Sequence, residues 1–420
     1  MSLGRPLTLC YFQDVRSRTI IVLATLDTKG HEAQYLRESI EAQGHQALVI
    51  DASVTGEPAA RADIPREKVA DLGGKPMSEL LRNPTREEAA PVMAAGATKI
   101  IRGLVADGKA HGILSLGGTQ GTTLATRVMR ALPYGFPKVM VSTMASGNVA
   151  PWVDTRDITM MFSVTDIMGL NPFIRRILAN AAAATCGMAE VDVSLERGEK
   201  PLVAVTTVGI TTTGAMKAAE RLEKAGYETI VFATVGAGGR AMEDMMQEGL
   251  INAVLDFSLI EVSNEMHAAL LAAGPDRLTR AGKLGLPQVI CPGAIDVLVF
   301  NEPHTVPERY AGRTLVPHSP QITDVRLNKE EMAAVGREVA RRLQHTSRDA
   351  VMMIPTAGYE SYGVSGGPFH DPEADAAFAS ELKAHLPSSV RVVERATHIN
   401  DPAFATEAAE TLIGLLAARQ

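Results

Sequence analysis

The sequence predicts an α/β protein with two tandem Rossmann-like domains, each built on a mainly parallel sheet flanked by helices. Continuous apolar runs rich in β-branched residues, such as TIIVLAT at 19–25, alternate with helix-length segments along the chain, as expected for parallel strands buried on both faces. Glycine-rich turns follow several of these runs, at the points where strands pass into helices. The length of 420 residues also exceeds the size at which a single core usually splits into two.

The first half of the chain fits a repeated alternation of strand and helix. Strands are expected at 19–25, 46–51, 111–116 and 138–142, and helices at 31–43, 87–108, 122–132 and from 172 onward. Pro172 suits the first turn of the last of these helices. Residues 52–85 are rich in proline, glycine and charge, so we expect a functional loop or flap there rather than a compact element.

The second half restarts the alternation after a polar segment, 192–200, where we place the domain boundary. The predicted domains are therefore 1–195 and 196–420. Further strands are expected at 202–208, 229–233, 253–257, 288–291, 297–300, 350–354 and 390–394, and helices at 215–225, 329–344, 372–385 and 402–418. Strands and helices that alternate at these lengths indicate parallel sheets with right-handed crossovers.

Composition limits the class of partner. A net charge of −7 and a pI of about 5.9 argue against a nucleic-acid or membrane-surface partner. The N-terminal apolar run PLTLCYF is too short for a signal peptide or a membrane span, and polar residues follow it directly. Three widely spaced cysteines suit a reducing cytoplasm and build no disulfide framework. The histidines of the second half, His318 among them, lack the spacing of a zinc site, so we predict no metal bound by protein ligands.

The stretch LSLGGTQGTT at 114–123 contains the first candidate site. An apolar strand breaks here into three glycines and then becomes a helix: Gly117, Gly118 and Gly121. Glycines give the backbone room, and a helix N-terminus offers unpaired N–H groups and the positive end of its dipole, which suits a phosphate or a carboxylate. Three hydroxyls add donors: Thr119, Thr122 and Thr123. The turn lacks the lysine of a Walker A loop and the spacing of the dinucleotide fingerprint, and α/β proteins without a ligand also carry glycines at such turns.

Two other strand ends supply the remaining walls of the predicted pocket. In DTKG, after the first strand, Asp27 and Thr28 either cap the following helix or face the glycine turn together with Lys29. The third such turn is STMASGN, and its candidate residues are Ser142, Met144, Ser146 and Gly147. Because the carboxyl ends of parallel strands meet at one edge of the sheet, we predict one pocket whose positive charge comes from Lys29.

The second domain has two glycine turns of its own, GITTTG at 209–214 and GAGGR at 236–240. Arg240 beside three glycines is typical of an anion clamp, although a surface arginine after a tight turn gives the same pattern. Glu261 lies near a predicted strand end and suits acid–base chemistry. We predict a second site there, for a small acidic ligand, with these residues: Thr211, Thr212, Thr213, Gly238, Gly239, Arg240 and Glu261.

Several segments in the same order make this sequence similar to a known family. They are ATLDTKG, LGGTQGTT, LPYGFPKVMVSTMASGN, DIMGLNPFIRRILANAAAA, YETIVFATVGAGGRAMEDMM, PGAIDVLVF and HINDPAFA. Over almost its full length the chain resembles the family of the ATP-binding domain of the tomato tobamovirus-resistance protein, an inhibitor of viral RNA replication. That family includes bacterial relatives of unassigned function.

The resemblance implies two α/β subdomains, ATP with magnesium in the first, and a homodimer. On this sequence the implied nucleotide contacts are Asp27 to Lys29, Gly117 through Thr123, and the turn from Ser142 to Gly147. The family's loop is usually denser in glycine, whereas this chain has Thr119-Gln120, a difference that affects the phosphate geometry rather than the fold. Antiviral activity belongs to plant members with a further C-terminal domain and is not expected here.

The sequence therefore predicts a cytoplasmic ATP-binding protein, with no catalytic residue assigned. Two roles stay open for the nucleotide. One is an ATP-dependent enzyme that acts on a small acidic metabolite in a cleft between the domains. The other is a non-catalytic, ATP-regulated binding module that acts through a macromolecular partner. A nicotinamide oxidoreductase on the same fold is disfavoured, because no G-x-G-x-x-G precedes a suitably spaced acidic residue.

Overall fold

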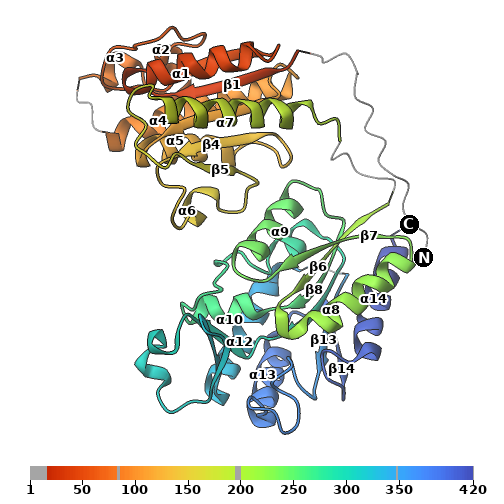
Figure 1. The fold of residues 1–420 in the computed structure, drawn as a ribbon. Coiled ribbons are helices and arrows are strands. Elements are labelled where there is room, and N and C mark those ends of the chain that lie inside the picture. The colour runs from red at the N-terminus through yellow and green to blue at the C-terminus, as the bar shows by residue number, and fades with distance from the viewer. Residues whose placement is uncertain (1–16, 83–85, 194–199, 347–348, 420) are drawn as a thin grey trace, which may run out of the picture. The chain divides into compact units, whose positions relative to one another are not determined.

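The computed structural model describes residues 17–82, 86–193, 200–346 and 349–419. Contacts within the chain divide it into two compact units, Met1–Leu195 and Glu196–Gln420 (Figure 1). The predicted boundary between 195 and 196 lies within 194–199, outside the described residues. Each unit carries a parallel sheet with helices on both faces, which confirms the predicted fold class.

The described residues of the N-terminal unit form a five-stranded parallel sheet in the order β2-β1-β3-β4-β5. Its strands are β1 (Thr19–Ala24), β2 (Gln46–Asp51), β3 (Gly112–Gly117), β4 (Lys138–Ser142) and β5 (Thr159–Phe162). The first described strand, β1, pairs with β2 on one side. On its other side it pairs with β3. The connections after β1 and β3 therefore diverge, which is the arrangement that opens a crevice at the carboxyl edge of a parallel sheet.

Helices cover both faces of this sheet. On one face lie α1 (Leu26–Glu41) and α7 (Pro172–Glu190), which contact each other and pack on alternate residues of β1, β3 and β4. The alanine-rich segment of α7 thus packs within its own unit. The other face carries α4 (Arg86–Ala106) and α5 (Thr119–Arg130), and the short α6 (Ala150–Val153) lies beside α5.

The prediction of a loop or flap over 52–85 is wrong for its second half. That part contains α2 (Arg66–Gly73) and α3 (Met77–Leu80), and the core includes Val69, Ala70, Met77 and Leu80 of these helices. The α2 and α4 backbones approach so closely that a Cβ on Gly96 would lie 1.8 Å from the Val69 carbonyl oxygen. Proline begins both helices and Gly74 ends α2 in a left-handed conformation, so the proline and glycine mark helix ends rather than one continuous loop.

The described residues of the C-terminal unit form a six-stranded parallel sheet in the order β14-β13-β9-β8-β6-β7. Its strands are β6 (Leu202–Thr207), β7 (Glu228–Ala233), β8 (Ala253–Ser258), β9 (Gln288–Gly293), β13 (Ala350–Pro355) and β14 (Val390–Arg395). The first strand of the unit, β6, lies between β7 and β8. Its strand order therefore reverses beside β6, as the order of the N-terminal sheet reverses beside β1.

Helices also cover both faces of the C-terminal sheet. One face carries α8 (Thr212–Lys224) and α14 (Pro402–Ala417). The other carries α9 (Ala237–Gln247), α10 (Ile260–Met266), α11 (Arg280–Leu284), α12 (Lys329–Arg342) and α13 (Pro372–His385). The strand expected at 297–300 forms, as β10 (Val297–Phe300), but in a separate antiparallel sheet with β12 (Ile322–Arg326) and β11 (Leu315–Ser319).

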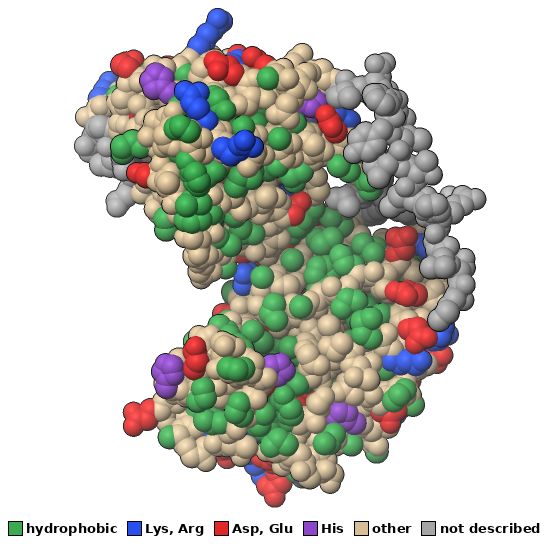
Figure 2. All heavy atoms as spheres, viewed as in Figure 1, with side chains coloured by type: hydrophobic (Ala, Val, Ile, Leu, Met, Phe, Trp, Pro, Cys, Tyr) green, Lys and Arg blue, Asp and Glu red, His purple; other side chains and the backbone are tan. Residues whose placement is uncertain are grey.

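Two features bear on the expected lack of membrane and nucleic-acid partners, which stays a prediction. Within the described part of the chain, one helix segment, Glu88–Ala106, is long and apolar enough to cross a membrane. It belongs to α4, which packs on α2 and α5, and 33% of this segment is buried. On the face drawn in Figure 2, acidic and basic side chains are interspersed rather than gathered into a patch of one sign.

Candidate functional site

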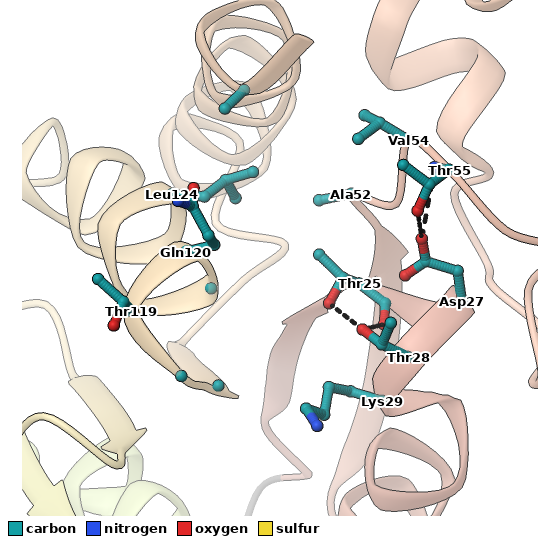
Figure 3. Close-up of a pocket in the computed structure, with 14 residues that line it drawn as sticks. Thr25, Asp27, Thr28, Lys29, Ala52, Val54, Thr55, Thr119, Gln120 and Leu124 are labelled. Carbon is teal, nitrogen blue, oxygen red and sulfur yellow. Dashed lines mark hydrogen bonds between the residues drawn. The ribbon is translucent and has the colours of Figure 1, made fainter. Parts of the chain in front are cut away.

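A cavity of about 370 Å³ lies at the carboxyl edge of the N-terminal sheet, at the point where the strand order reverses. One wall follows β1, a second follows β2, and the third is the glycine turn after β3 (Figure 3). The lining residues are Thr25, Asp27, Thr28, Lys29, Ala52, Val54, Thr55, Ala90, Gly117, Gly118, Thr119, Gln120, Gly121 and Leu124. This position and volume are typical of small-molecule sites in α/β proteins.

The glycines of the turn after β3 have different roles. A Cβ on Gly117 would lie 3.0 Å from the Cα of Gly121, so these two residues allow the turn to close on itself. A Cβ on Gly118 would meet nothing closer than 3.7 Å, so this position leaves room beside the cavity. Gly118 is also the N-cap of α5 and has no side chain to cap it. The first-turn N–H groups of α5 therefore have no capping side chain among the described residues, and that turn lines the cavity.

Lys29 lies across the cavity from this turn (Figure 3). Its backbone has a non-helical conformation, φ −126° and ψ 21°, which kinks α1 just after its first turn. The Lys29 ammonium donates a hydrogen bond to the carbonyl oxygen of Ile167. The hydroxyls of Thr25 and Thr28 are 3.1 Å apart on the same wall. This wall therefore offers one cation and two hydroxyls to the space in front of α5.

The two carboxylate oxygens of Asp27 differ in their hydrogen bonding. Oδ2 accepts hydrogen bonds from the Thr55 hydroxyl at 2.7 Å and from the Gly56 N–H at 3.2 Å, which hold the chain that follows β2. Oδ1 is buried and has no hydrogen-bond partner among the described residues. A buried acceptor without a partner is costly, so Oδ1 is suited to a donor that a ligand or an ordered water brings.

The opposite end of the cavity is apolar. Val54 and Leu124 lie there, away from Lys29 (Figure 3), and Ala52 and Ala90 add small aliphatic side chains to the lining. The cavity therefore has a polar end, with helix amides and a lysine, and an apolar end of small aliphatic side chains. This arrangement suits a ligand with an anionic group at one end and a flat or aliphatic group at the other.

Several residues predicted for this pocket do not line it. Thr122 and Ser142 are fully buried, and their hydroxyls are 2.7 Å apart, so they join α5 to the end of β4. Thr123 accepts a hydrogen bond from the indole N–H of Trp152 at 3.1 Å. The turn with Met144, Ser146 and Gly147 is tied to β4, because the Met144 N–H donates to the Ser142 hydroxyl. The predicted third wall is thus replaced by residues that follow β2.

In the C-terminal unit, Glu261 occupies the position where a ligand anion was expected. Its Oε1 accepts hydrogen bonds from the Gly236 N–H at 2.7 Å and the Gly239 N–H at 3.0 Å, at the N-terminus of α9. Its Oε2 accepts a third from Arg277 Nε at 2.7 Å. Burial raises the pKa of Glu261, while the Arg277 guanidinium lowers it. The anion site predicted from GAGGR is therefore filled by a carboxylate of the protein itself.

Arg277 is fully buried and holds Glu261 in a network of acidic groups. Its guanidinium donates two hydrogen bonds of 2.6 Å to the Asp256 carboxylate and lies 3.7 Å from Glu243. Burial raises the pKa of Glu243 to about 7, although Arg277 opposes this. A buried arginine shared by several carboxylates is a structural element whose removal leaves uncompensated charge in the core.

The other residues of the predicted second site are dispersed. Thr211 is buried and its hydroxyl bonds to the Val208 backbone, and Thr212 bonds to the same carbonyl. Thr213 is exposed. A Cβ on Gly238 would lie 1.8 Å from the Ala233 carbonyl oxygen, so this glycine serves the β7–α9 turn. Arg240 lies within hydrogen-bond distance of the Ala272 carbonyl, at 3.4 Å.

Comparison with known proteins gives the family. The N-terminal domain of the uncharacterised protein family UPF0261 matches residues 18–194, and the C-terminal domain of the same family matches residues 200–416. The chain belongs to the UPF0261 family. The UPF0261 protein of Clostridium tetani is 41% identical over 401 residues, covering 95% of this chain and 99% of that protein. The corresponding protein of Rhizobium meliloti is 41% identical over 393 residues, with coverage of 93% and 97%.

More distant similarity extends to a plant protein and to a solved enzyme structure. The ToMV resistance protein Tm-1 of Solanum lycopersicum is 34% identical over 310 residues, which are 72% of this UPF0261 chain and 41% of the tomato protein. The predicted resemblance is confirmed for the UPF0261 family and its bacterial relatives, whereas ATP binding stays a prediction. The UDP-GlcNAc 2-epimerase of Neisseria meningitidis has 11% identity and a TM-score of 0.22, covering 65% of this chain and 82% of its own. A likeness of that size carries no functional conclusion.

Sequence reasoning missed six of the residues that line the cavity in this UPF0261 chain. They are Thr25, Ala52, Val54, Thr55, Ala90 and Leu124. Ala52, Val54 and Thr55 directly follow the predicted strand at 46–51, so the rule that identified Lys29 also applied to them. Their apolar or neutral side chains carry no chemical signal, and they were assigned to a loop instead.

Proposed function

We propose that the N-terminal domain of this UPF0261 protein binds a nucleotide through its phosphates. The observation that carries the proposal is the N-terminus of α5, which begins at Gly118 without a capping side chain and lines a cavity opposite Lys29. Helix N-termini of this kind bind phosphate through their N–H groups and the positive end of the dipole. The apolar end of the same cavity suits the base of the nucleotide.

ATP is the nucleotide that the family resemblance implies, and the proposal adopts it. Magnesium would accompany ATP and would be held mainly by phosphate oxygens and water. Among the described residues that line the cavity, Asp27 offers the one carboxylate, and its partnerless Oδ1 suits a water of such an ion. Lys29 would exchange its bond to the Ile167 carbonyl for a phosphate oxygen. The protein's contribution would be positioning and charge neutralisation.

Calorimetric titration of the full chain with MgATP tests the proposal. Replacing Lys29→Ala should lower the affinity roughly tenfold to hundredfold, because a charge-assisted hydrogen bond is worth about 1.5–3 kcal/mol. Lys68→Ala is the matched control, since Lys68 is an exposed lysine of α2 outside the cavity. Unchanged affinity in Lys29→Ala, or binding of NAD in place of ATP, would contradict the proposal. Phosphate release in the same mixture distinguishes an ATP-consuming enzyme from an ATP-regulated binding module.

A further inference from the structure

A second cavity, of about 180 Å³, lies in the C-terminal unit at the carboxyl edge of its sheet. Val208, Gly209 and Ile210 follow β6, and Ile260 follows β8, so the cavity lies where the order of this sheet reverses. The small antiparallel sheet closes another side with residues of β10, β11 and β12. The cavity thus corresponds in position to the cavity of the N-terminal unit, but other residues line it.

Most of the wall is aliphatic. Its apolar side chains are Val208, Ile210, Val235, Ile260, Leu271, Val299 and Ile322. The remaining lining residues are Gly209, His318 and Asp324. The ring of His318 packs beside Gly209, where a Cβ would be 3.7 Å from its Cε1, an ordinary van der Waals distance. The polar side chains of the cavity are therefore one histidine and one carboxylate, both contributed by the small sheet.

Asp324 is only 4% exposed, yet its carboxylate accepts no hydrogen bond from any described residue. Its one polar contact there is with Nδ1 of His318, at 3.8 Å, while that nitrogen lies closer to the Tyr362 hydroxyl, at 3.1 Å. Burial raises the pKa of Asp324 to about 6, against the opposing effect of His318. At neutral pH the group is consequently ionised, buried and short of a donor, which is a costly arrangement that a bound donor relieves.

We propose that this cavity binds a small aliphatic primary amine, with its ammonium group on the Asp324 carboxylate and its hydrocarbon part against the aliphatic wall. An apolar cavity of about 150 Å³ accommodates a benzene-sized molecule, so the ligand has roughly six to eight non-hydrogen atoms. The ligand's charge is opposite to that of the acidic ligand expected from Arg240 and Glu261. The inference is independent of nucleotide binding in the N-terminal domain.

Three probes with one carbon skeleton test the chemistry on the unaltered full chain: isoamylamine, isoamyl alcohol and isovalerate. Saturation-transfer NMR detects binding, and calorimetry measures affinity. We expect the amine to bind at least about tenfold more tightly than the alcohol, and isovalerate not to compete, because a carboxylate would face Asp324. Equal binding of amine and alcohol, preferential binding of isovalerate, or no binding of the amine at millimolar concentration would each overturn the proposal.

Two variants locate the site. Asp324→Asn should lower the amine affinity roughly tenfold to hundredfold, whereas Asp276→Asn, at an exposed aspartate of the same unit, should leave it unchanged. If Asp324→Asn does not fold, Leu271→Phe provides the second variant, since it fills the cavity from a partly exposed position and keeps the carboxylate. Full amine affinity in either folded variant would place the binding site elsewhere and overturn the proposal.

Discussion

The two domains share a parallel sheet and a glycine turn in front of a helix, yet the helix N-termini have different partners. In the N-terminal domain, α5 begins at Gly118 without a capping side chain, and its first turn lines a cavity. In the C-terminal domain, the Glu261 carboxylate bonds to two N–H groups at the start of α9. A glycine turn therefore indicates a ligand site only where the rest of the fold leaves the helix N-terminus open.

The two cavities also differ in charge, because different side chains reach them. The first has Lys29 and helix amides, which favour an anion, whereas the second has the buried carboxylate of Asp324, which favours a donor. Each cavity lies where the strand order of its sheet reverses, so topology sets the place. The side chains that reach this place decide which kind of ligand it accepts.

The largest expected effect concerns the N-terminus of α9, where the Glu261 carboxylate accepts hydrogen bonds from the helix N–H groups. Replacing Arg277→Met should lower the free energy of unfolding by about 3–5 kcal/mol, because it leaves Asp256 and Glu261 buried without their cation. Chemical denaturation followed by circular dichroism measures the loss. Arg280→Met, at a partly exposed arginine 3.6 Å from Asp244, should cost less than about 1 kcal/mol. Similar losses in the two variants would contradict the structural role assigned to Glu261 and Arg277.

Closing the open helix N-terminus should have the next largest effect. Gly118 has φ −80° and ψ −161°, a conformation that an N-cap aspartate adopts. Gly118→Asp would cap α5 and repel phosphate, so the affinity for MgATP should fall at least about tenfold, with stability unchanged or raised by a few tenths of a kcal/mol. Calorimetry and thermal unfolding measure the two quantities. Gly103→Asp, on an exposed site of α4, is the control that should bind as the wild type does.

The smallest effect is a pH dependence in the acidic region near the second cavity. Burial raises the pKa of Glu360 to about 9, with a further contribution from Asp296. Because the pKa in the folded chain lies above its unfolded value, the stabilisation is complete below about pH 4.5 and is lost as the pH rises through 9. Between pH 7.5 and 9, Glu360→Gln should therefore flatten the decline in unfolding free energy by up to about 1.4 kcal/mol per pH unit. Equal slopes in both proteins would refute this assignment.

That pH range separates Glu360 from two of its acidic neighbours. Asp324 and Asp375 also face this region, and burial raises their pKa values to about 6 and about 7. Arg326 lowers the pKa of Glu360 and stays charged throughout. Above pH 7.5 the two aspartates are largely ionised, so the remaining slope from these three carboxyl groups reports Glu360.

Most of the strands, and the cavity walls that follow β1 and β3, were predictable because their signals are local. TIIVLAT can be identified as a buried parallel strand without further context, and Lys29 and Gly118 each follow such a run. The strand β5 and the antiparallel strands β11 and β12 were not predicted. β11 contains Pro317, and β12 places the polar Thr323, Asp324 and Arg326 in buried positions, which contradicts an alternating pattern.

The other features that the sequence did not predict depend on strand order and on contacts between residues far apart in the chain. The rule that ligands bind after strand ends applies equally to the residues after β2 and after β4, and the choice between them depends on pairing across the sheet. The sequence also separates Glu261 from Gly239 by more than twenty residues, so their hydrogen bond is visible only in the folded chain. Glu261 was predicted to serve acid–base chemistry in a ligand site, whereas its carboxylate accepts hydrogen bonds from the protein's own amides.

The bond from the Trp152 indole to Thr123 has a practical consequence. Trp152 is the single tryptophan of the chain, and Thr123 lies in the second turn of α5, close to the cavity. Selective excitation of the indole therefore yields emission from the N-terminal domain alone. A ligand that binds against α5 should change the surroundings, and so the emission, of this fluorophore. The native chain thus carries an unlabelled reporter for the N-terminal cavity.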